Sequence, residues 1–260
     1  MAEKTAIAWT DKTFNPWMGC AKVSEGCRNC YALTLTKNRM GLQVFGNNPR
    51  QVTKEPWRNV KKWNREAPDH VGVLGAGEPD LVFCASLCDV FEDHPTANEV
   101  RPDVFNLVRE CQNLHFQILT KRPDRIVDNL PEDWGDGWPN VWLGTSIEDM
   151  RVAHRADILR SIPAVVRFIS YEPALGPLDE IDLTDIDWLI YGGESGPGYR
   201  PEGTKDDPKK WARDIMARCR EFGTAYFHKQ SAAHRTEIGI ELDGRIVREF
   251  PVPRTVVVTA

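Results

Sequence analysis

The sequence predicts an α/β protein built as a partial (β/α) barrel of the TIM-like type, with a small β-hairpin near its C-terminal end. Two observations support this fold class. Short apolar segments alternate with helical stretches through most of the chain, which is typical of a parallel sheet. The apolar segments also end in polar, chemically reactive residues, as strands do at the active-site face of a barrel.

Six segments are expected to be strands buried on both faces. Each is a near-continuous apolar run without strict alternation, which is the pattern of parallel strands covered on both sides. The expected strands are residues 81–87 (LVFCASL), 115–121 (HFQILTK), 141–147 (VWLGTSI), 165–171 (VVRFISY), 188–194 (WLIYGGE) and 224–230 (TAYFHKQ).

Stretches with helical character lie before or between these strands. The expected helices are residues 52–66, 101–111, 124–129, 148–161 and 207–222. The last begins with Asp-Asp-Pro and is followed by Gly223, which are good start and stop signals for a helix.

The strand ends favour a closed or nearly closed barrel over an open, doubly wound sheet. A doubly wound sheet concentrates its site at one switch point, whereas a barrel collects site residues from many strand ends. Polar residues stand at six of the expected ends: Cys88-Asp89, Lys121-Arg122, Ser146, Glu172, Glu194 and Lys229-Gln230.

The chain is expected to form one barrel domain over residues 1–237, followed by a hairpin and tail over residues 238–260. Residues 41–80 lack a clear strand, so we expect them to be an insertion between a cysteine-rich loop and the second strand. In the tail, two alternating segments flank Asp243-Gly244, which is a strong hairpin signal.

Composition indicates a cytoplasmic protein without a membrane partner. Apolar residues make up 41% and charged residues 27% of the 260 residues, as in ordinary soluble domains. The formal net charge of −5 gives no global attraction to nucleic acid or anionic lipid. The first residues do not resemble a secretory signal, and no apolar run is long enough to span a bilayer. In a reducing compartment, clustered thiols are expected to be metal ligands and not to form disulfides.

Three cysteines near the N-terminus point to metal chemistry. Cys20, Cys27 and Cys30 have the spacing C-x6-C-x2-C. A closed zinc site takes four ligands, usually as two pairs, whereas a [4Fe–4S] cluster held by three cysteines leaves one iron open. Bound S-adenosylmethionine could be reductively cleaved at such an iron to start radical chemistry. The pattern therefore favours an enzyme.

An ordered set of motifs resembles a phage and bacterial family related to radical S-adenosylmethionine enzymes. The resemblance covers about residues 9 to 230. Its blocks are NPWMGC…CRNCYA, SLCDVFE, ILTKRP, WLGTSIED, SYEPALGP, WLIYGGESGPGYRP and YFHKQ.

The resemblance implies a partial barrel with a [4Fe–4S] cluster on Cys20, Cys27 and Cys30. An external electron donor would reduce the cluster, and the cofactor would give a deoxyadenosyl radical that acts on a substrate in the barrel mouth. That substrate stays open among nucleobase, peptide and metabolite, with nucleic acid one open partner.

The sequence departs from the usual radical S-adenosylmethionine pattern in two places. That pattern is C-x3-C-x2-C with an aromatic residue before the last cysteine, whereas here the first gap is six residues and Asn29 holds the aromatic position. The Gly192-Gly193-Glu194 element ends the penultimate expected strand, whereas the usual amino-group-binding element ends the second.

Four strand-end residues are candidates for holding the cofactor. Ser86 and Asp89 could accept hydrogen bonds from its ammonium group; the alternative for Asp89 is a helix cap. Lys121 and Arg122 could bind a carboxylate or phosphate. The alternative for these two is an ion pair with Glu172 or Glu194 inside the mouth.

Later strand ends add further candidates. Ser146 and Glu172 are expected to contact the cofactor, and a carboxylate at Glu172 suits ribose hydroxyls or a substrate amine. Gly192 and Gly193 would let a ligand approach the backbone closely, with Glu194 beside them.

Among these residues, Lys121, Glu172 and Glu194 are the candidate catalytic groups. Lys229 is a weaker candidate for the site, and His228 is expected to be structural.

The competing hypothesis is a zinc-binding, nucleic-acid-associated protein without catalysis. Cys84, Cys88 or His94 would then complete the zinc site. Residues 50–65 carry basic side chains around Trp57 and Trp63, which suit a nucleic-acid backbone with stacking platforms. The alternative for this stretch is a solvated amphipathic helix whose tryptophans pack on the barrel, which we favour.

Overall fold

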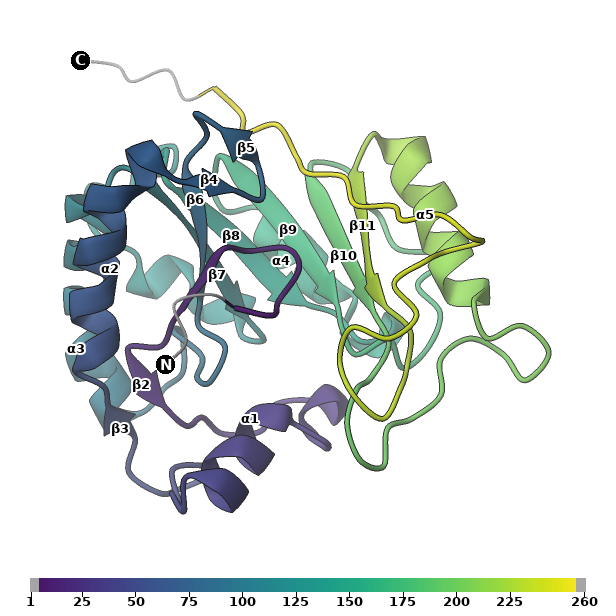
Figure 1. Ribbon diagram of the computed structural model, residues 1–260, viewed down its shortest axis with the longest axis horizontal. Coiled ribbons are helices and arrows are strands. Elements are labelled where there is room, and N and C mark those ends of the chain that lie inside the picture. The colour runs from purple at the N-terminus through teal and green to yellow at the C-terminus, as the bar shows by residue number, and fades with distance from the viewer. Residues whose placement is uncertain (1–4, 256–260) are drawn as a thin grey trace.

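The computed structural model describes residues 5–255 and is built around a seven-stranded, fully parallel sheet (Figure 1). The strands lie in chain order, with β1 at one edge and β11 at the other. They are β1 Lys12–Phe14, β6 Asp80–Cys84, β7 Leu114–Thr120, β8 Val141–Ser146, β9 Val166–Tyr171, β10 Trp188–Gly192 and β11 Ala225–Gln230. The sheet is a half-barrel, which confirms the predicted fold class.

Four α-helices pack on the convex side of the sheet: α2 Glu55–Glu66, α3 Pro95–Glu110, α4 His154–Arg160 and α5 Lys210–Phe222 (Figure 1). The short α1, Tyr31–Thr34, lies beyond one end of the strands (Figure 1). Two small antiparallel pairs accompany the sheet: β2 Trp17–Met18 with β3 Gln51–Val52, and β4 Val71–Gly72 with β5 Gly75–Ala76. None of the helices within residues 5–255 combines the length and the apolar character that a bilayer crossing requires.

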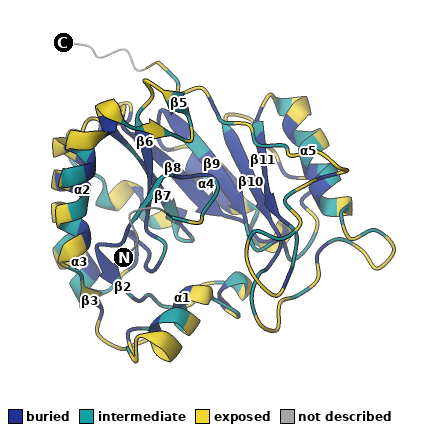
Figure 2. Ribbon diagram, viewed as in Figure 1, coloured by how far each residue is buried: buried dark blue, intermediate teal, exposed yellow. Residues whose placement is uncertain are grey.

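Two apolar cores, one on each face of the sheet, account for the near-continuous apolar strands. The larger core lies between the sheet and the helices, and a smaller aromatic core fills the concave side. In the smaller core, Trp9 packs on Phe83 with ring centroids 4.6 Å apart, and Trp188 contacts both Trp142 and Phe168. The strands are consequently buried along most of their length (Figure 2).

The predicted elements differ from the observed ones mainly at their ends. All six predicted strands form, each beginning within one residue of its expected start. The strand β1 was not predicted because it is too short to give an apolar pattern. Residues 124–129 form two 3-10 turns, Pro123–Arg125 and Val127–Asn129, and not an α-helix.

Helices α2 and α5 begin three residues later than expected, at Glu55 and Lys210. Helices α3 and α4 begin further from their expected starts because other residues cap them. Helix α3 begins at Pro95, where His94 accepts a hydrogen bond from the Thr96 N–H, and it carries Pro102 inside. In the predicted helix 148–161, Asp149 instead caps a 3-10 turn, Met150–Val152, and α4 follows from His154.

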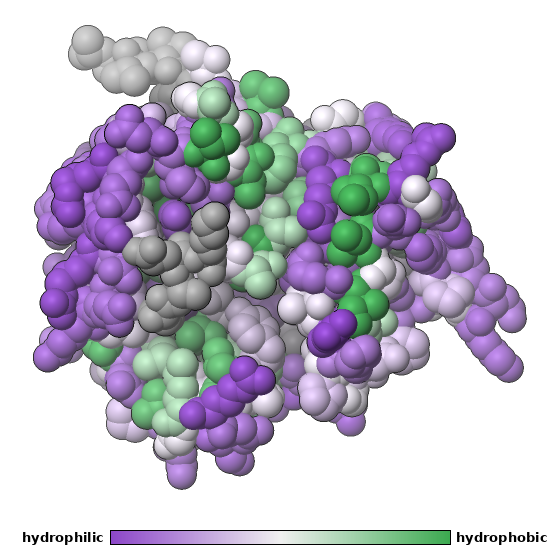
Figure 3. Space-filling view, in the orientation of Figure 1, coloured by the Kyte–Doolittle hydropathy of each residue, from purple (hydrophilic) through white to green (hydrophobic). Residues whose placement is uncertain are grey.

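Helix α2 lies in the expected insertion and packs its tryptophans inward. Trp57 meets Phe14 edge-on with centroids 5.3 Å apart, and Trp63 is buried. The outer face of α2 is hydrophilic (Figure 3). The helix is therefore the solvated amphipathic element favoured above. Neither indole forms an exposed stacking platform.

The tail makes the predicted tight turn but not two paired strands. Asp243 and Gly244 both have positive φ angles, 51° and 76°, and a bridge joins Leu242 to Arg245. Beyond the turn, the chain runs along β11, where the His228 N–H donates to the Val247 carbonyl at 2.7 Å. An edge strand exposes unpaired backbone groups, and the tail satisfies several of them on β11.

His228 is structural, as expected. It is fully buried, stacks on Tyr191 with centroids 5.4 Å apart, and hydrogen-bonds the Tyr226 hydroxyl and the Gly239 carbonyl. Burial lowers the pKa of His228 to about 4.

We predict that His228 makes the protein less stable as the pH falls below about 6.5. Between that pH and about 4, the unfolded chain binds a proton at this residue that the folded chain does not. The loss should reach about 3 kcal/mol at the acid end of this range. Urea unfolding of the wild type and of His228→Gln across this range measures it. The variant should have a flatter pH profile, whereas His234→Gln, at an exposed histidine nearby, should keep the wild-type slope; equal slopes in all three proteins would contradict the prediction.

Candidate functional site

The cysteine loop, residues 19–30, lies across the C-terminal ends of the parallel strands (Figure 1). Of its three thiols, Cys27 is buried, and Cys20 and Cys30 are partly exposed. Burial raises the pKa of the Cys20 thiol, and the nearby Asp89 and Cys30 raise it further. Cys20 is therefore a protonated thiol at neutral pH, and metal uptake would release its proton.

The backbone around Cys20 is fixed by hydrogen bonds to distant segments. The Gly19 N–H donates to the Leu87 carbonyl at 3.0 Å, and the Cys20 carbonyl accepts from the Gly46 N–H at 3.1 Å. Gly19 has a φ of 101°, and a Cβ there would lie 1.9 Å from the Val44 carbonyl oxygen. Only glycine permits this approach.

The peptide groups on both sides of Ala21, the residue after Cys20, are held by buried charges. The Ala21 N–H donates to Glu92 at 2.5 Å, and its carbonyl accepts from Arg122 at 2.8 Å. Glu92 also forms an ion pair with Arg50 at 2.8 Å, with both side chains 1% exposed. Arg50, expected to be one of the basic residues of a surface patch, is therefore buried support for the cysteine loop.

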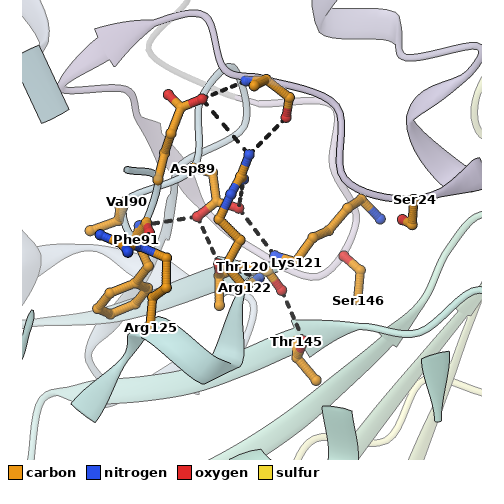
Figure 4. Close-up of polar contacts among 12 residues, drawn as sticks. Ser24, Asp89, Val90, Phe91, Thr120, Lys121, Arg122, Arg125, Thr145 and Ser146 are labelled. Atoms are coloured by element: carbon orange, nitrogen blue, oxygen red, sulfur yellow. Dashed lines mark hydrogen bonds and ion pairs between the residues drawn. The ribbon is translucent and has the colours of Figure 1, made fainter. Parts of the chain in front are cut away.

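Asp89 joins the loop after β6 to the end of β7 (Figure 4). Its carboxylate accepts from the Thr120 hydroxyl at 2.7 Å, from the Lys121 N–H at 3.1 Å and from Arg122 at 2.8 Å. It also accepts from the Phe91 N–H at 3.0 Å in a local turn. The Asp89 carboxylate therefore caps a turn and not an α-helix.

Glu148 is the charged residue at the end of β8 that the sequence analysis did not select. Its carboxylate accepts from Ser24 at 2.8 Å, from Arg155 at 3.1 Å and from Lys121. The side chain is 1% exposed. A Cβ on Gly26 would lie 2.4 Å from its Oε1 atom, so the loop backbone rests directly on this carboxylate. The only sequence signal was its place two residues beyond a strand end.

Glu194, after β10, is the third carboxylate in contact with the cysteine loop. Its carboxylate accepts hydrogen bonds from the Asn29 side-chain amide at 3.0 Å and from the backbone N–H and the guanidinium of Arg200 at 2.9 Å or less. The Arg200 guanidinium also donates to the Glu25 carboxylate of the loop at 2.8 Å. Burial alone would raise the pKa of Glu194, but the hydrogen bonds from Arg200 and Asn29 outweigh it and hold the pKa below its ordinary value.

Glu172 and Lys229 form a separate pair at the ends of β9 and β11. The lysine ammonium donates to Glu172 at 2.5 Å, with the two side chains 10% and 22% exposed. A Cβ on Gly192 would lie 2.9 Å from the Glu172 carboxyl carbon, and one on Gly193 would lie 2.1 Å from the Ala232 nitrogen. The two glycines therefore admit protein groups at close range.

The two candidate serines lie just after β6 and at the end of β8, with β7 between these strands. Ser86 accepts a hydrogen bond from Asn15 at 3.0 Å, and its carbonyl accepts one from the Tyr31 hydroxyl at 2.6 Å. Ser146 is buried at the end of β8, with its side chain near Lys121 (Figure 4).

The structure corrects the ion pairs expected for the two basic residues after β7. Lys121 pairs with Glu148 and Arg122 with Asp89; neither pairs with Glu172 or Glu194. The reason is adjacency, because β7 lies between β6 and β8, whereas Glu172 and Glu194 follow strands further along the sheet.

The thiols of Cys20, Cys27 and Cys30 are compatible with a cluster-binding motif. Among residues 5–255, no group of three or more His, Cys, Asp or Glu side chains, these three cysteines included, is arranged in this structure to hold a metal ion. Cys84 and Cys88 are buried, and burial raises the pKa of both thiols. His94 uses its Nδ1 atom to cap α3.

A closed zinc site would need a fourth ligand brought close to the loop. A cubane instead binds each thiolate at a different iron and leaves one iron without a protein ligand, so three thiols of one loop meet its requirement.

Comparison with known proteins gives one finding. A family model described as "Protein of unknown function (DUF5131)" matches residues 4–251. No curated protein and no solved structure matches the chain.

We predict that Glu92→Ala costs about 3–5 kcal/mol of folding free energy, because it leaves Arg50 charged, buried and unpaired. The matched control is Glu110→Ala, which breaks the exposed ion pair with Lys61 and should cost far less. Urea unfolding of the three proteins measures the difference. Equal losses in the two variants would show that the buried pair does not support the loop as described.

Proposed function

The chain belongs to the DUF5131 family of proteins of unknown function, and we propose that it is a radical S-adenosylmethionine-type enzyme. In this proposal Cys20, Cys27 and Cys30 hold a [4Fe–4S] cluster, and the fourth iron binds the cofactor.

The observation that carries the proposal is the position of the three thiols. They stand in one loop over the C-terminal edge of a parallel half-barrel, where the strand ends bring their charged residues together. In barrel enzymes this edge is where active sites are assembled. A redox cluster there would face the mouth in which a substrate binds.

When bound, a three-cysteine cluster supplies the electron that cleaves the carbon–sulfur bond of S-adenosylmethionine. The chain's own residues would bind and orient the cofactor. Glu172 retains an oxygen beyond its bond to Lys229, which suits an ammonium or ribose hydroxyl. Lys121, 20% exposed beside the buried Glu148, suits a carboxylate. Mixed charges of this kind favour a zwitterionic ligand.

The experiment is anaerobic reconstitution followed by incubation with dithionite and S-adenosylmethionine. The protein should become brown and produce deoxyadenosine. Replacement of Cys20, Cys27 or Cys30 by Ala should abolish both properties, whereas Cys88→Ala, at a neighbouring thiol outside the trio, should keep the colour. A colourless wild type that is correctly folded would refute the proposal, and loss of the colour in Cys88→Ala would mean a fourth protein ligand.

We also predict that Glu172→Gln weakens cofactor turnover and leaves cluster assembly intact. The amide keeps the size of the side chain but loses the charge that faces Lys229 and the mouth. The loss should be about tenfold or more in deoxyadenosine formation, at an unchanged iron content. Glu180→Gln, an exposed glutamate, is the matched control. Wild-type turnover in Glu172→Gln, or loss of iron from it, would contradict the assignment.

A further inference from the structure

Three carboxylates that follow different strands hold the cysteine loop: Glu148 and Glu194 directly, and Asp89 through Arg122. Each contact lies within three residues of a different cysteine, and beside Cys20 the Ala21 N–H also donates to Glu92. We propose that these carboxylates are positioning residues, each of which fixes one thiol. The pairs are Asp89 with Cys20, Glu148 with Cys27, and Glu194 with Cys30. The inference rests on the proposed function only in that the three thiols are taken to act together.

Cys20 is positioned through an arginine. Asp89 accepts a hydrogen bond from Arg122 at 2.8 Å, and the other end of that guanidinium donates to the Ala21 carbonyl at 2.8 Å. Asp89 in turn is bonded to Thr120 and to the Lys121 N–H. Hydrogen bonds therefore connect the end of β7 to the peptide beside Cys20 without a break.

Cys27 is positioned by direct contact. Glu148 accepts from the Ser24 hydroxyl at 2.8 Å, and the Gly26 backbone lies too close to this carboxylate to leave room for a side chain. Two cations, Lys121 and Arg155, pair with the same carboxylate. The 3-10 turn that ends at Cys27 thus rests on a buried charge whose own place is fixed.

Cys30 is positioned through its neighbour. Asn29 donates to Glu194 at 3.0 Å and to the Gly198 carbonyl at 3.1 Å. Arg200 fixes the same carboxylate and extends to Glu25. This contact lies after β10, two strands along the sheet from the Glu148 contact.

The three contacts share no carboxylate and follow different strands. Two residues link them, because Lys121 bonds both Asp89 and Glu148, and Arg200 bonds both Glu194 and Glu25. Removing one charge should therefore loosen the loop most next to its own cysteine. A hydrogen bond from or to a charged group contributes more than a neutral one, so Asp→Asn or Glu→Gln, which keeps the shape, should be enough to open the contact.

The test is thiol alkylation of the metal-free protein, with mass spectrometry to read each cysteine separately. Iodoacetamide is applied in short pulses at fixed pH to the wild type, Asp89→Asn, Glu148→Gln and Glu194→Gln. Each variant should raise the alkylation rate of its own cysteine by roughly tenfold and those of the other two by clearly less. Glu110→Gln, far from the loop and paired with Lys61, should change none.

A second set of variants covers the case in which a charge substitution unfolds the protein. Ser24→Ala and Asn29→Ala remove the loop side of two contacts and leave each carboxylate paired with its cations. They should raise the rates at Cys27 and Cys30 respectively. Unchanged rates, or equal acceleration of all three thiols in variants that stay folded, would overturn the proposal. Because the protein is metal-free, this result does not depend on whether a cluster forms.

Discussion

Charge buried at the carboxyl ends of the strands must be paired, and this requirement decides where the cysteine loop lies. Asp89, Glu148 and Glu194 are each at most 6% exposed, and an unpaired charge at such a depth would cost several kcal/mol. Neighbouring strands supply most of the partners, including Arg122 for Asp89, and the loop adds hydrogen bonds from Ser24 to Glu148 and from Asn29 to Glu194. The loop therefore completes the pairing that the sheet leaves unfinished.

The charged residues at the strand ends therefore have two different roles. The carboxylates under the loop have their oxygens occupied by protein donors and act as supports. Glu172 lies just after β9, and Lys229 lies on β11. Within residues 5–255 the ion pair found for each of them is the one with the other, and both side chains are partly exposed. In the proposed function, Glu172 and Lys121 contact the cofactor, whereas Asp89, Glu148 and Glu194 support the loop.

Much of the fold could be predicted from the sequence because it follows from repeated, local patterns. The apolar run of Trp188–Gly192 identifies a strand buried on both faces, and parallel strands necessarily bring their polar ends to one edge. Pairing at that edge could not be predicted, because it depends on which side chains reach across. Lys121 meets Glu148 and not Glu172 for this reason, and Glu148 was not selected although it lies in the same motif as Ser146. The tail was misjudged in part because β11 offers it a better partner than its own turn does.

The proposed cluster site consists of three thiols held over the strand ends. Iron and acid-labile sulfide analysis after anaerobic reconstitution, with zinc measured in the same sample, tests it directly. We predict about four iron and four sulfide per chain and little zinc. One tightly bound zinc per chain with no sulfide, in protein that remains folded, would contradict it.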